Sequence, residues 1–130
     1  MTGMRLFGLP VVAIAFGAFI ICAETCLHVE DIVHPKSWID LPIHDWLAGI
    51  FLVWTGIVGR RDWNKARSYL AAAWGFMTSL LFGAVVAHWE EFSPQAQGDG
   101  WVSDRAFIAI LIGLLVFGLC ALIGTLKRQS

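Results

Sequence analysis

Charged residues are scarce in this chain. Asp, Glu, Lys and Arg make up only 15% of its 130 residues, whereas 58% are hydrophobic and the mean hydropathy is +0.70. A soluble domain of this length cannot bury so much apolar surface, but a lipid bilayer can solvate it. The net charge of -1 and the lack of a basic stripe with interleaved aromatic residues argue against a nucleic-acid partner. The composition therefore predicts one integral membrane domain, residues 1–130, with the lipid bilayer as its partner.

Sequence signatures of several chemistries are also missing. The chain has no glycine-rich nucleotide loop, no catalytic serine or cysteine motif and no haem signature. Its three cysteines are odd in number and lie in or beside apolar runs, so they do not indicate a disulfide framework. Cys22 and Cys26 are better interpreted as small packing residues than as a redox pair. These absences leave open whether the protein is an enzyme.

Four long apolar runs divide the chain. Residues 6–23 carry no charge, and a helix of this length covers most of the roughly 30 Å of hydrocarbon in a bilayer. Arg5 and Ala23 also fit a secretory signal peptide, but three further apolar runs favour a first membrane helix. The sequence predicts an all-α integral membrane protein with four transmembrane helices in an up-down antiparallel bundle. We expect the helices at about residues 6–33, 42–59, 66–91 and 105–127.

Individual residues set the expected ends and packing of these helices. Pro35 should end the extension of the first helix near His34, and Gly59 should end the second helix. The third run is rich in alanine and glycine, which let helices approach closely in lipid. It is therefore expected to form the inner helix of the bundle.

The basic residues predict the orientation. Seven of the nine Lys and Arg residues fall on the side that holds both chain ends, and the positive-inside rule places that side in the cytoplasm. Nine of the ten acidic residues and all four histidines then face outward. We expect a multi-pass protein of a cytoplasmic-type (inner) membrane with both termini inside and a polar outer rim.

The outer rim holds the residues that indicate chemistry. Residues 24–45 contain three of the four histidines and five of the ten acidic residues, and the fourth histidine lies in a second polar segment, residues 88–91. Histidine and carboxylate residues recur there at helical spacings, i to i+4 in one segment and i to i+3 in the other. Imidazole and carboxylate are the ligands of zinc, copper and iron. The predicted ligands, or residues supporting them, are Glu24, His28, His44, His88 and Glu91.

Several functions fit this rim. The predicted function is binding of a transition metal (zinc, copper or iron) for redox chemistry or metal handling. The same residues also fit a structural hydrogen-bond network or a path for a proton or ligand. The alternative function is an accessory subunit of a larger membrane complex, with a partner subunit or a second copy of the chain packed on the third helix. A transporter is less favoured, because only Thr55, Thr78 and Ser79 offer polar groups between the helix ends.

Overall fold

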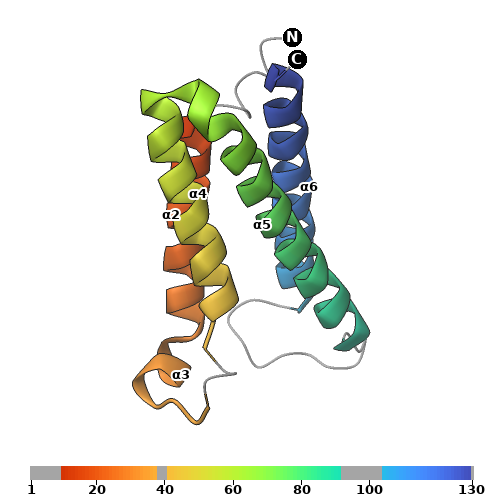
Figure 1. Cartoon of the computed structure of the whole chain (residues 1–130). Helices are drawn as coiled ribbons and strands as arrows, with labels where there is room; N and C mark the ends of the chain where they lie inside the picture. Colours follow the sequence, from red (N-terminus) through yellow and green to blue (C-terminus); the bar gives the residue numbers. More distant parts are fainter. Residues whose placement is uncertain (1–9, 38–40, 92–103, 130) are drawn as a thin grey trace.

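The computed structural model describes residues 10–37, 41–91 and 104–129, and within these ranges every regular element is a helix (Figure 1). The elements are α2 (Pro10–Leu27), α3 (Val29–Val33), α4 (Ile43–Arg61), α5 (Trp63–Glu91) and α6 (Asp104–Gln129). The four long helices coincide with the four apolar runs. The predicted all-α fold is confirmed for the described part of the chain.

The helix ends differ from expectation in two places. The first predicted helix is interrupted at His28, which lies between α2 and α3, and α3 then ends at Val33, two residues before Pro35. The prediction that Gly59 ends the second helix is wrong. Gly59 is buried against Pro10 instead, and α4 continues to Arg61 before the backbone becomes extended at Asp62.

The four long helices form two hairpins. α2 packs along α4 to form the first hairpin, and α5 packs along α6 to form the second hairpin. Asp62 joins them, because it ends α4 and its Oδ1 accepts a hydrogen bond from the Lys65 backbone N–H at 3.3 Å in the first turn of α5. Figure 1 shows the hairpins meeting near this turn and spreading apart toward the end where α3 lies.

Glycines bring the two helices of the first hairpin into backbone contact. A Cβ atom added at Gly17 would lie 2.5 Å from the backbone oxygen of Gly49, and one added at Gly56 would lie 2.6 Å from that of Pro10. The prediction that the third apolar run, now α5, forms the closely packed inner helix of the bundle is met only in part. α5 packs against both α4 and α6, but within the described part of the chain its own Gly75 and Gly83 have no neighbour within 4 Å of an added Cβ. The close helix approach therefore lies in the first hairpin.

An aromatic cluster joins the hairpins in the protein core. The Phe16 ring of α2 lies 5.2 Å from the Trp74 ring of α5 and stacks at 5.2 Å on Phe117 of α6. Thr55 and Thr125 are fully buried, and each hydroxyl donates to a backbone oxygen of its own helix. Their polar groups are thus satisfied without water, as an apolar environment requires.

The outer surface indicates a membrane protein. Pro10–Leu27, Trp63–Trp89 and Arg105–Lys127 are long and apolar enough to cross a bilayer. Large side chains such as Phe19, Phe82 and Val116 remain more than half exposed on them. α4 is not among the helices that are long and apolar enough to cross a bilayer. Charged residues at both of its ends confine its uncharged stretch to residues 46–59.

Candidate binding cavity

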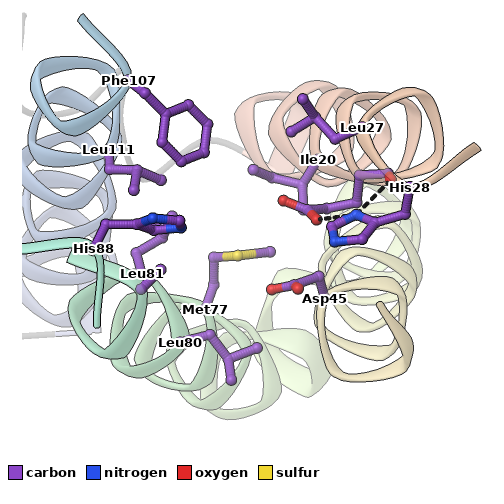
Figure 2. Close-up of a pocket in the computed structure, with 12 residues that line it drawn as sticks. Ile20, Leu27, His28, Asp45, Met77, Leu80, Leu81, His88, Phe107 and Leu111 are labelled. Atoms are coloured by element: carbon purple, nitrogen blue, oxygen red, sulfur yellow. Dashed lines mark hydrogen bonds and ion pairs between the residues drawn. The ribbon is translucent and has the colours of Figure 1, made fainter. Parts of the chain in front are cut away.

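A cavity of about 230 Å³ lies between the two hairpins. All four long helices contribute to its wall, at the end of the molecule where the hairpins spread apart (Figures 1 and 2). The residues that line it are Ile20, Glu24, Leu27, His28, Asp45, Met77, Leu80, Leu81, Ala84, His88, Phe107 and Leu111.

The cavity is elongated along the helix axes. Met77 and His88 both line it from α5 and are eleven residues apart, which corresponds to about 16 Å of helix. Its inner end, which we call the floor, is entirely apolar and lies one to two helical turns from the aromatic cluster in the sequence of each helix. The floor consists of Ile20, Met77, Leu80, Leu81 and Leu111.

Three ionisable residues of the first hairpin, Glu24, His28 and Asp45, form what we call the polar wall. The Nδ1 atom of His28 lies 3.1 Å from the backbone oxygen of Glu24 and 3.3 Å from its Oε2 atom. These contacts favour a proton on Nδ1, which leaves Nε2 as the acceptor nitrogen. In Figure 2 the His28 ring and the Asp45 carboxylate lie on the same side of the cavity.

His88 faces the polar wall from the second hairpin. Its ring packs edge-on against Phe107 of α6, with the ring centroids 4.9 Å apart and an angle of 83° between the planes. Figure 2 shows His88 across the cavity from His28. An aromatic neighbour rather than a carboxylate thus supports this histidine among the described residues.

The structure brings together three of the five predicted site residues. Glu24, His28 and His88 line the cavity, whereas His44 is exposed and does not. Glu91 ends α5, and its side chain lies outside what the structure describes. Asp45 was not among the predicted ligands, although its place beside His44 at the start of the second helix was the signal for it. Within residues 10–37, 41–91 and 104–129, no three His, Cys, Asp or Glu residues are arranged to hold a metal ion.

No protein-family model, curated protein or solved structure matches this chain. The cavity is therefore interpreted from its own residues.

The Glu24 charge is expected to cost stability, which is typical of a residue kept for binding. It is half-buried, lies near the carboxyl end of α2, where the helix dipole disfavours negative charge, and is repelled by Asp45. Among the described residues, only His28 offsets these effects. Glu24→Gln should raise the free energy of unfolding in detergent by about 1 kcal/mol, measured by thermal unfolding at pH 8. Glu30→Gln, in the exposed first turn of α3, is the control and should give no gain.

Proposed function

We propose that the chain is a four-helix integral membrane protein that binds a cation in the cavity between its hairpins. Three helices are apolar enough to span a bilayer. α4 packs in backbone contact along α2, so the proposal places α4 in the membrane beside it. The positive-inside rule favours a cytoplasmic location for the basic α4–α5 turn and both termini, in a cytoplasmic-type membrane. The cavity then opens toward the outer side.

The observation that carries cation binding is the charge of the polar wall. Glu24 and Asp45 line one cavity, and among the described residues that line it there is no Lys or Arg. Among the described residues, His28 and the exposed His44 are the groups that compensate this charge. Two partly buried carboxylates with so little compensation attract positive charge, because water reaches them poorly and a bound cation restores the balance.

A transition metal is the first candidate for this cation. Glu24 holds His28 through Nδ1, as carboxylates hold histidine ligands in many metal sites, and leaves Nε2 for the metal. Asp45 would be the second ligand. His88 would complete the site if the second hairpin moved toward the first. Zinc, copper or iron suits these donors, for metal handling or redox chemistry.

Metal content of the detergent-purified protein tests this candidate. We expect stoichiometric zinc, copper or iron in the wild type, lost in His28→Ala and in Asp45→Asn. His44→Ala is the matched control, because it removes an exposed imidazole next to Asp45 and should retain the metal. A wild type that holds no metal and takes none up would exclude the transition-metal candidate.

A second candidate function is that of an accessory subunit or homo-oligomer. A stripe of small residues, spaced by four, runs along a partly exposed face of α5, and an added Cβ at Gly75 or Gly83 would meet no described atom within 4 Å. Such stripes let a second membrane helix approach closely. Isolation in mild detergent as a lone monomer would count against this function. The stripe consists of Ala71, Gly75, Ser79, Gly83 and Ala87.

A further inference from the structure

We propose that the cavity takes a second kind of cation, a small organic ammonium compound with an apolar tail, in competition with a metal ion. This inference rests on the proposed cation-binding function and specifies its ligand class. A bare metal ion would use the polar wall alone. The cavity continues about one to two helical turns beyond that wall, and the extra space is lined by aliphatic side chains and a thioether.

The floor provides the site for the tail. Met77 is 1% exposed and Leu81 is 6% exposed, so the floor that they form is tightly packed and dry. Phe16 and Trp74, about one helical turn before Ile20 and Met77 in the sequence, pack together in the core next to this floor. A pocket that is apolar at its closed end and charged nearer its open end is complementary to a molecule that is apolar at one end and charged at the other.

The spacing of floor and polar wall sets the length of the ligand. Ile20 and Glu24 are four residues apart on α2, which corresponds to about 6 Å along the helix. An ammonium group at Glu24 and Asp45 would therefore place a two-carbon linker and a ring against the floor. The volume of about 230 Å³ is below the range of drug-sized pockets, which begins at about 300 Å³, and this favours a small ligand.

Equilibrium dialysis of the full-length protein in detergent tests this inference, with radiolabelled 2-phenylethylammonium as the probe. Propylbenzene, which has the same shape without the charge, is the control ligand. We expect saturable binding of the ammonium compound at one site per chain, and at least tenfold weaker binding of propylbenzene. Equal binding of both would overturn the inference, since the polar wall would then have no role in recognition.

Two variants separate the tail site from the charge site. Ala84→Leu adds bulk within the cavity and should weaken binding of the ammonium compound at least tenfold, whereas Ala87→Leu adds the same bulk at an exposed position three residues later and should not. Glu24→Gln, which we expect to be more stable than the wild type, should also weaken binding. Binding unaffected by both Ala84→Leu and Glu24→Gln would overturn the inference.

Zinc uptake measured on the same samples distinguishes failure of this inference from failure of the proposed function. Uptake of zinc through Asp45 without binding of the ammonium compound would overturn the organic ligand and leave cation binding standing. If the protein binds neither zinc nor the ammonium compound, both the organic ligand and the proposed cation binding are overturned. If the wild type binds the ammonium compound and Asp45→Asn abolishes this binding, both the organic ligand and the proposed cation binding are supported.

Discussion

Replacing Gly17 with alanine should lower the free energy of unfolding by about 3 kcal/mol, at the upper end of the usual cost of overpacking a core. The added Cβ would lie 2.5 Å from the Gly49 backbone oxygen and 2.9 Å from Cγ2 of Val53. A flexible side chain can move aside, but a helix backbone cannot without separating α2 from α4. Thermal unfolding or SDS titration of the detergent-purified protein measures the loss.

Gly83→Ala is the matched control for this substitution. Gly83 is also within a long helix, but an added Cβ meets none of the atoms that the structure describes within 4 Å. Because alanine favours the helix by up to about 1 kcal/mol over glycine, this variant should be as stable as the wild type or more so. Equal losses in both variants would show that the backbone contact of the first hairpin does not determine stability.

Truncation of Trp74 to alanine should cost about 3 to 5 kcal/mol, because it removes the largest fully buried side chain of the described core. The loss has two parts. The hydrophobic contact with Phe16 and Phe117 disappears, and with it the side chain that connects the two hairpins through the centre of the protein. We expect a lower unfolding midpoint and a broader transition, measured by near-UV circular dichroism.

A second substitution at the same position separates packing from polarity. The Nε1 atom of Trp74 is buried and has no hydrogen-bond partner among the described residues, so Trp74→Phe removes an unsatisfied polar group while it keeps most of the aromatic volume. It should cost less than half as much as Trp74→Ala. Trp89→Ala, at a site that is 64% exposed, is the control and should change stability little. A large loss from Trp89→Ala would mean that tryptophan burial in this core is not the main factor.

The sequence predicts the helices well because apolar runs and their length are local properties. The fold class, the four long helices and the end of α3 before Pro35 all follow from such patterns. The break at His28 does not, because Leu27, His28 and Val29 include neither proline nor glycine. The break lies where the chain leaves the first hairpin, so a longer α2 would gain no further packing contacts with α4.

The cavity was only partly predictable, and the pair His44 and Asp45 shows why. The i to i+4 spacing indicates that Glu24 and His28 share a helix face, and the structure places them in contact. Neighbouring residues on a helix, however, point about 100° apart, so either His44 or Asp45 can face α2, but not both. The register of α4 against α2, fixed by the contact of Gly17 with Gly49, decides in favour of Asp45. That register depends on packing between distant segments.

The glycine contacts of the first hairpin also bear on biogenesis. α2 and α4 emerge from the ribosome first and meet through backbone atoms, which need no partner side chain from α5 or α6. We therefore expect this pair to associate as soon as both segments have entered the bilayer, before the second half of the chain is made. The second hairpin then docks through the Phe16, Trp74 and Phe117 rings and the buried aliphatic side chains around them, and the cavity is the space that this late docking leaves unfilled.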